Sequence, residues 1–150
     1  MKTLSRERDR AELLGRLRTL RQDSVGRWGR MSAHQAVCHL SDSFLAVTGR
    51  KDVSMAAGLL QRTVVKWIAL YVPLRWPSGI RTRPELDQQL GGTRPAQFAQ
   101  DVTRLAELVE QATSAEPHWH QHPRFGRMSD AEWLRWGYLH MDHHLRQFGV

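Results

Sequence analysis

Two histidines near the end of the chain have the spacing of metal ligands. They are His140 and His144, and they lie within S-D-A-E-W-L-R-W-G-Y-L-H-M-D-H-H-L-R-Q-F-G, residues 129–149. On a helix, side chains four residues apart are neighbours, with about 5–6 Å between their Cβ atoms, so both rings can hold one metal ion. His143 lies on the flank of the same face and is an alternative ligand. Because a bare H-x-x-x-H pair often has only a structural role, a third ligand from elsewhere decides the interpretation.

One candidate for a third ligand is His39, at the edge of an apolar helical stripe. Polar groups able to orient its ring stand nearby in the sequence, namely Gln35, Asp42 and Ser43. The alternative for His39 is a partly buried histidine that is hydrogen-bonded to a backbone carbonyl and binds nothing.

A rival metal site lies in the loop before the last helix. His118, His120 and His122 alternate with other residues, so an extended backbone would place their side chains on one side. A loop gives such ligands no rigid support, and Pro123 indicates a turn. The loop is therefore the weaker alternative to a site on helices.

The histidine pair requires a helix, and residues 129–148 have a marked start for one. Ser129 can cap the first turn, and Glu132 three residues later completes a capping box. At about 100° per residue, one broad face carries Trp133, Trp136, Gly137, His140, His144, Gln147 and Phe148. The opposite face is predicted to carry Arg135, Tyr138, Asp142 and Arg146.

Three more helices are predicted over residues 5–22, 32–48 and 95–115. The first has a leucine stripe of Leu13, Leu14, Leu17 and Leu20. Ser32 and Gln35 repeat the capping-box pattern at the start of the second. Pro95 is predicted to start the third, whose stripe is Phe98, Val102, Leu105, Val109 and Ala112.

The connection between the second and third of these helices is long. Residues 55–72 are predicted to form an extra helix that is apolar nearly all round, and residues 73–94, rich in proline, are predicted to be irregular. No strand pattern is present. The chain is therefore predicted to be all-α, with residues 1–150 forming a single domain. That domain would be a four-helix bundle with a long crossover, including the extra helix, between the second and third bundle helices.

The extra helix has more apolar surface than one buried face needs. We expect it to be covered by the crossover loop, by a partner subunit or by both, and we expect a homodimer.

Composition narrows the functional class. The chain has 150 residues, 41% hydrophobic and 25% charged, as in globular proteins. The net charge of +7 comes from scattered arginines without a block or recognition motif, so no nucleic-acid partner is expected. Cys38 is the only cysteine, which excludes an internal disulfide and a C-x-x-C zinc site. No signal-peptide core or bilayer-spanning stretch is recognised, so no membrane partner is expected and a cytoplasmic location is predicted.

Three pieces of the chain together resemble a known superfamily. They are W-G-R-M-S-A-H-Q-A-V-C-H-L, H-P-R-F-G-R-M-S-D-A-E-W and H-M-D-H-H-L-R-Q-F-G. They resemble the DinB-like (YfiT-like) superfamily of small metal-binding four-helix bundles, and specifically a branch of unknown function. The Pro-rich P-S-G-I-R-T-R-P-E-L is similar to the same branch. The resemblance extends from about residue 27 to residue 149.

The resemblance implies a ligand set. In the superfamily one histidine of the second helix and an H-x-x-x-H pair of the last helix bind a divalent metal, which here implies His39, His140 and His144. Gln147 matches a family position and is expected beside the ligands. Three imidazoles suit zinc or nickel, with iron or manganese as alternatives. Three protein ligands also leave a position for water or substrate.

The resemblance also implies a function. Some relatives are transferases or isomerases that use low-molecular-weight thiols, and a divalent cation lowers the pKa of a bound thiol. The expected substrate or thiol is a small molecule in a pocket lined by Trp133, Trp136 and part of the 55–72 helix. Arginines at the mouth would hold an acidic cosubstrate. Catalytic residues are not assigned.

Two other functions remain open. In a metal-dependent hydrolase an activated water would be the nucleophile, and Asp42 and Gln35 are weak candidates for its base. In a non-catalytic metal-binding stress-response module there would be no reaction.

Overall fold

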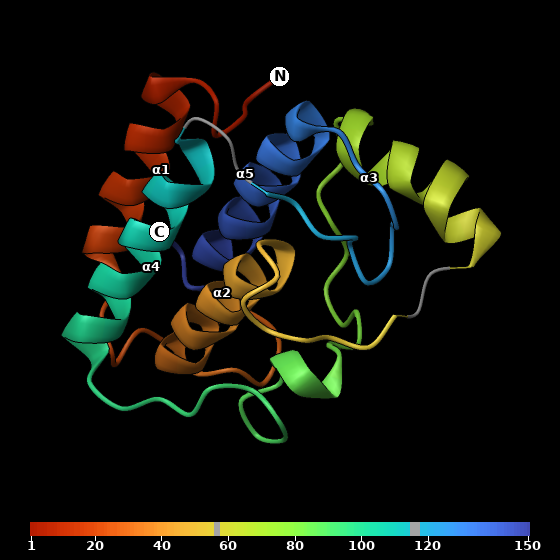
Figure 1. Ribbon diagram of the computed structural model, residues 1–150. Coiled ribbons are helices and arrows are strands. Elements are labelled where there is room, and N and C mark those ends of the chain that lie inside the picture. The colour runs from red at the N-terminus through yellow and green to blue at the C-terminus, as the bar shows by residue number, and fades with distance from the viewer. Residues whose placement is uncertain (56–57, 115–117) are drawn as a thin grey trace.

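The protein is all-helical over the residues that the computed structural model describes, which are 1–55, 58–114 and 118–150 (Figure 1). The longer helices are α1 (Glu7–Thr19), α2 (Ala33–Val47), α4 (Phe98–Thr113) and α5 (Asp130–Gln147). Between α2 and α4 the chain forms a π-helical turn η1 (Gln61–Val65), the short helix α3 (Lys66–Tyr71) and the 3-10 turn η2 (Pro84–Leu86). The described residues contain no β-strand, which confirms the prediction that the chain is all-α.

Helices α1, α2, α4 and α5 share one hydrophobic core. Each contributes fully buried side chains, including Leu13, Val37, Leu105 and Met141. Each such side chain stabilises the fold by about 1.5–3 kcal/mol relative to leaving it in water. Both predicted capping boxes are present, at the start of α2 and of α5, so these two helix starts are as expected.

The helix that carries the histidine pair is buried on more than one side. Helix α5 contacts α1 and α2 on one side and α3 on the other (Figure 1). Tyr138 was predicted on the face opposite the imidazoles, but it is buried in the common core with Met141 and Leu145. The prediction was wrong because a helix between two neighbours needs two apolar stripes rather than one.

The predicted helix boundaries need small corrections. Helix α1 is shorter than residues 5–22 at both ends, and α4 begins at Phe98 rather than at Pro95. Residues before Phe98 stay extended because Thr93 and Ala96 donate backbone hydrogen bonds to Asp42 and Asp101. Residue 115, at the end of the predicted third bundle helix, and residues 56–57 of the predicted extra helix lie outside the described residues.

The crossover between α2 and α4 is fastened to α2 by one buried carboxylate. The side chain of Asp42 is fully buried. Its Oδ1 accepts from the Thr93 hydroxyl at 2.6 Å and pairs with Lys51 Nζ at 3.0 Å. Its Oδ2 accepts from Thr93 N at 2.7 Å and Gln88 Nε2 at 3.1 Å. Residues 73–94 are irregular, as predicted, except for η2.

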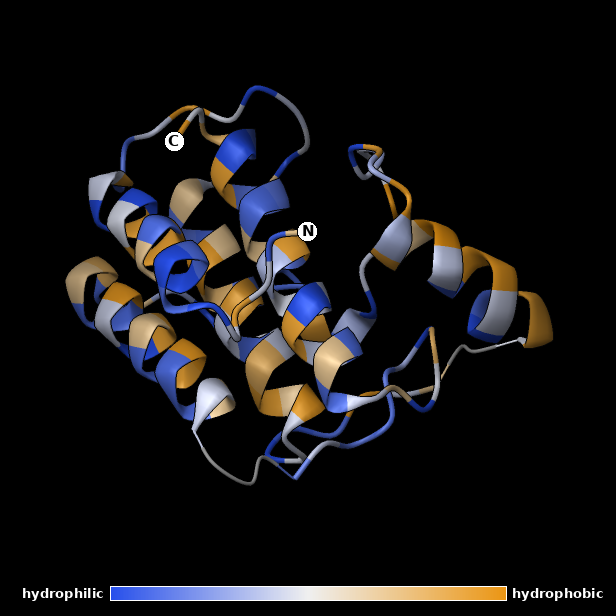
Figure 2. Cartoon of the chain, turned by 90° about the horizontal axis from the view of Figure 1, so that it is seen from above, coloured by the Kyte–Doolittle hydropathy of each residue, from blue (hydrophilic) through white to orange (hydrophobic). Residues whose placement is uncertain are grey.

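The extra helix projects to one side of the four core helices (Figure 2). Leu70 is fully buried against α5, but Leu59 and Trp67 are 83% and 59% exposed. The crossover loop therefore leaves the outer face of this helix uncovered, and its cover by a partner subunit in a homodimer stays a prediction. Over the described ranges, no helix combines the length and the apolar character that crossing a membrane requires.

Candidate metal centre

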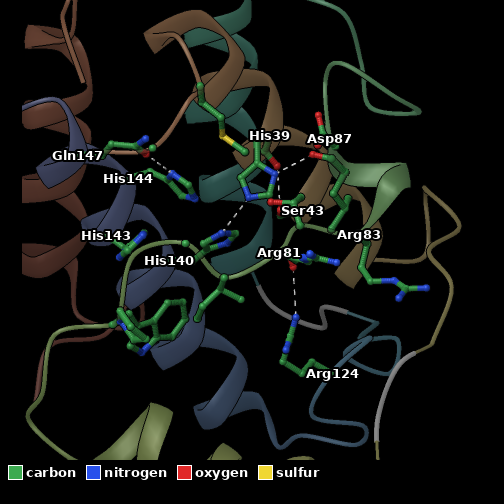
Figure 3. A pocket seen from close by; sticks show the side chains of 18 of the residues that line it. His39, Ser43, Arg81, Arg83, Asp87, Arg124, His140, His143, His144 and Gln147 are labelled. Carbon is green, nitrogen blue, oxygen red and sulfur yellow. Dashed lines mark hydrogen bonds between the residues drawn. The ribbon is translucent and has the colours of Figure 1, made fainter. Parts of the chain in front are cut away.

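Three imidazoles from two helices meet at one point. His39 stands on α2, and His140 and His144 stand on α5. One ring nitrogen from each lies within 4.8 Å of the others, and the Nε2 atoms of His39 and His140 are 3.2 Å apart. Figure 3 shows the three rings pointing toward one another at the end of the cavity.

Gly137, one turn before His140, packs closely against the N-terminal segment. A Cβ added there would lie 2.7 Å from Leu4 Cδ1, whereas 3.5 Å from the Phe44 ring of α2 is an ordinary van der Waals distance. A larger side chain at this position would therefore have to displace the buried side chain of Leu4.

The crossover orients the ring of His39. Its Nδ1 lies 2.9 Å from the backbone oxygen of Leu86. A carbonyl oxygen only accepts, so Nδ1 carries the proton and the neutral ring keeps an unprotonated Nε2 facing His140. The hydrogen bond to a backbone carbonyl that the sequence alternative for His39 named is present, and this bond points the free nitrogen of the ring at the other two histidines.

The ring of His144 is oriented in the same way by Gln147. Its Nδ1 lies 2.9 Å from Gln147 Oε1, and Gln147 Nε2 donates to the Trp28 carbonyl at 2.8 Å. The second bond fixes which end of the amide faces His144. Nδ1 therefore donates, and the Nε2 lone pair of His144 is free. Gly29, with φ +79°, lies so close that a Cβ there would be 2.8 Å from Gln147 Nε2.

His140 lacks such a partner. Its Nδ1 is buried and has no hydrogen bond within the described structure, and the same holds for Nδ1 of His143. His143 lines the cavity between the rings of Trp28 and Trp76 and does not belong to the convergent group. The structure therefore places His143 beside the three histidines rather than among them.

Burial keeps the convergent rings neutral. Desolvation lowers the pKa of His39, and it lowers the pKa of His140 and of His144 well below the usual range, with repulsion between the rings acting in the same direction. Neutral imidazole is the form that binds metals. His39 and His144 thus present unprotonated Nε2 atoms to a common point, and His140 can do the same once its proton moves to Nδ1, which fits a divalent ion with nitrogen ligands.

The rival loop site does not form. His118 and His120 are exposed, and the His120 ring packs against Gly49 at the end of α2. His122 is buried against Phe125, and its Nδ1 accepts from the backbone nitrogens of Arg124 and Phe125 at 3.1 and 3.0 Å. Because this nitrogen is already used, the His122 ring is a structural part of the turn.

Of the predicted orienting groups only Gln147 has that role. Gln35 closes the capping box of α2, Ser43 donates to the backbone oxygen of His39, and Asp42 holds the crossover. A backbone carbonyl was foreseen as a partner of His39, but it could not be assigned to Leu86 because a backbone atom leaves no signal in the sequence. The Trp28 carbonyl was missed, although Trp28 opens the W-G-R-M piece of the resemblance.

The histidines lie at the wall of a cavity of about 1040 Å³. Trp136 and the inner side of η1 and α3, at Val65 and Ile68, line it as predicted. Trp133 does not, since it is buried behind Trp136 and stacks on Trp119. Trp76 from the crossover lines the cavity instead and lies 6.1 Å from the His140 ring.

A second group of donors joins α2 to the start of α4. Asp101 Oδ2 accepts from His34 Nε2 at 2.7 Å, from Cys38 Sγ at 3.8 Å and from Ala96 N at 3.3 Å. Burial, with the nearby charge of Asp101, raises the pKa of Cys38 to about 12. The thiol is therefore unreactive, and the contacts among His34, Cys38 and Asp101 serve to hold α2 against the start of α4.

Comparison with known protein families matches residues 6–149 to the family described as protein of unknown function DUF1569. Neither a curated protein nor a solved structure matches the chain.

Proposed function

We propose that this chain, which belongs to the DUF1569 family of proteins of unknown function, holds one divalent metal ion between His39, His140 and His144. The observation that carries the proposal is the pair of fixed tautomers, because the Leu86 carbonyl and Gln147 each hold a ring with Nε2 unprotonated. Buried histidines with a purely structural role need no such common orientation. The resemblance to DinB-like four-helix bundles supports the same ligands and the same bundle arrangement.

The chemistry of the donors indicates the metal. Three neutral imidazoles favour zinc or nickel over the harder cations, with iron and manganese as alternatives. Imidazole groups already oriented by hydrogen bonds bind a metal with little reorganisation. Within the described chain no carboxylate belongs to the convergent group, which argues against calcium or magnesium.

The proposed reaction is the transfer or isomerisation of a small molecule with the help of a low-molecular-weight thiol. A divalent ion, when bound, lowers the pKa of a bound thiol and so favours the nucleophilic thiolate. The protein's own groups orient the rings, and Trp76 and Trp136 give the cavity an apolar wall that excludes water. The volume of the cavity suits a substrate together with a small thiol.

The arrangement favours thiol chemistry over hydrolysis. A hydrolase needs a general base near the activated water, and the two candidates are occupied elsewhere. Asp42 is enclosed by partners from the crossover, and Gln35 caps α2. A purely metal-storing module would not need an adjoining cavity of this size.

The test is metal content followed by a thiol screen. Protein purified without an affinity tag is analysed for bound metal, and the loaded protein is then assayed with small thiols and an activated aryl halide. One ion per chain and metal-dependent consumption of thiol support the proposal. A chain that takes up no divalent ion contradicts it.

A further inference from the structure

Positive charge dominates the wall of the cavity beside the three histidines. Five arginines line it, at positions 30, 75, 81, 83 and 124, and Asp87 is the one carboxylate among the described lining residues. Within the described ranges none of the five arginines forms an ion pair. Five guanidinium groups and one carboxylate leave this wall with an excess of positive charge, which an anionic ligand would balance.

Arg81 and Arg124 are the best placed of the five. They come from the crossover and from the loop before α5, and Arg124 Nη2 donates to the backbone oxygen of Arg81 at 3.3 Å (Figure 3). The charge of Arg83 is partly balanced by Glu85. A hydrogen bond with Ser54 is the largest cause that lowers the pKa of Glu85, and the charge of Arg83 lowers it further. Among the described residues, Arg81 and Arg124 have no such counter-charge and are joined by the hydrogen bond between them, so we take this pair as the centre of the anion site.

Two guanidinium groups on one wall repel each other, and the repulsion is relieved when an anion binds between them. The planar guanidinium matches the geometry of a carboxylate, which it can bind through two parallel hydrogen bonds. A wall of this kind, at the mouth of a cavity, also attracts anions from solution. Asp87 lies on the other side, next to His39, and accepts from Gln89 N (Figure 3).

We propose that the cavity takes an acidic small molecule with two or more carboxylates. Its charged end lies on Arg81 and Arg124, and its reactive end reaches the three histidines. The inference rests on the proposed metal function for the reactive end, whereas the charged end depends on the arginines alone. The two parts can therefore be tested separately.

The first experiment compares two thiols on protein loaded with cobalt(II), whose absorption reports a thiol that reaches the metal. Mercaptosuccinate carries two carboxylates, and thioglycerol carries none. Mercaptosuccinate is expected to bind about tenfold more tightly or better at low ionic strength. Arg81→Gln and Arg124→Gln are each expected to weaken it roughly tenfold, as the loss of a charge-assisted hydrogen bond does, without changing thioglycerol binding.

Arg18→Gln is the matched control, because it removes the same charge from an exposed position on α1. The inference would be overturned if the two thiols bound with equal affinity. It would also be overturned if neither Arg81→Gln nor Arg124→Gln changed the affinity for mercaptosuccinate.

The second experiment uses metal-free protein and succinate, followed by tryptophan fluorescence, since Trp76 lines the cavity. Succinate binding that either cavity substitution abolishes supports the anion site independently of any metal. Succinate that does not bind, or that binds the variants equally well, overturns it. Failure of the metal proposal would give a different result: no thiol would produce a cobalt–thiol absorption band.

Discussion

The rings of His39 and His140 meet edge to face across the contact between α2 and α5, with their Nε2 atoms 3.2 Å apart. Because the Leu86 carbonyl keeps the His39 proton on Nδ1, the hydrogen bond between the rings needs a proton on His140 Nε2. A metal ion needs that same nitrogen unprotonated. Metal binding must therefore move the His140 proton to Nδ1, the buried nitrogen that has no partner.

The ligand set predicts different outcomes for neighbouring histidines. His144→Ala removes a proposed ligand and is expected to weaken metal binding far more than His143→Ala, whose ring lies at the cavity wall. Metal content and affinity of the two purified variants check this. Simultaneous replacement of His118, His120 and His122 is the control for the loop site and should leave the metal in place. Full, unweakened metal in His144→Ala would show that the ligand set is wrong.

Gln147 is expected to act on the metal through His144. Gln147→Leu keeps the three ligands but removes the acceptor of the His144 proton, and the loss of such an orienting partner typically costs about 10–100-fold in metal affinity. Competition with a chelator measures the change.

Gly29→Ala is a second way to disturb the same contact. The new methyl group would crowd Gln147 Nε2, and the positive φ of Gly29 disfavours alanine. Both variants should weaken metal binding in the same direction. If Gln147→Leu and Gly29→Ala both bind metal with unchanged affinity, Gln147 does not orient His144 for metal binding.

The carboxylate of Asp42 is expected to hold the crossover closed. Asp42→Asn puts a donor where Thr93 and Gln88 already donate, which should lower the free energy of unfolding by about 1–3 kcal/mol. Urea denaturation measures the loss. Asp23→Asn is the control because Asp23 lies in an exposed ion pair, and its midpoint should not move. An unchanged Asp42→Asn midpoint would mean that the crossover is held by other contacts.

Acid is expected to destabilise the metal-free protein. Burial lowers the pKa of His122 to about 3, against about 6.5 in the unfolded chain, and lowers those of His140 and His144 in the same direction. The unfolded chain therefore binds more protons below about pH 6.5. Stability is greatest above that pH and falls as the pH decreases, by up to about 1.4 kcal/mol per pH unit for each group.

Thermal unfolding between about pH 7 and pH 5 measures this slope. The control is His122→Asn, which keeps an acceptor for the Arg124 and Phe125 nitrogens but does not titrate. Its stability should depend less steeply on pH than that of the unchanged chain. An identical slope would mean that His122 is protonated equally in both states.

The exposed face of α3 is expected to bind a second copy of the chain. Trp67→Glu should abolish a homodimer that sedimentation detects at roughly tens of micromolar, since a charge cannot be buried there without a partner. Val25→Glu changes another exposed apolar residue, in the loop between α1 and α2, and should leave the dimer intact. If the protein without substitutions sediments as a monomer at these concentrations, the dimer prediction is wrong.

Patterns that repeat with the helix were predictable from the sequence. The capping boxes at Ser32 and Ser129 fixed two helix starts, and the spacing of His140 and His144 placed both rings on one face. That His39 faces them followed from the resemblance, because periodicity alone does not say which helices are neighbours. The occupation of the site by a metal stays a prediction.

Contacts between segments distant in sequence could not be predicted. Leu86 orients His39 through a backbone oxygen, which any residue would supply. Tyr138 was misplaced because the pattern of α5 alone does not reveal that α1 lies behind it. Pro95 suits the first turn of a helix, but the hydrogen bonds of Thr93 and Ala96 keep the chain extended past it.

The bond between Leu86 and His39 joins the crossover and the ligand set in one thermodynamic cycle. If a docked crossover raises metal affinity by a given factor, a bound metal raises the equilibrium constant for docking by the same factor. Any molecule that binds the docked crossover more tightly than the undocked one then raises the affinity for the metal, wherever on the crossover it binds. A metal bound as proposed would thus be coupled to the outer surface of the crossover through the carbonyl group of Leu86.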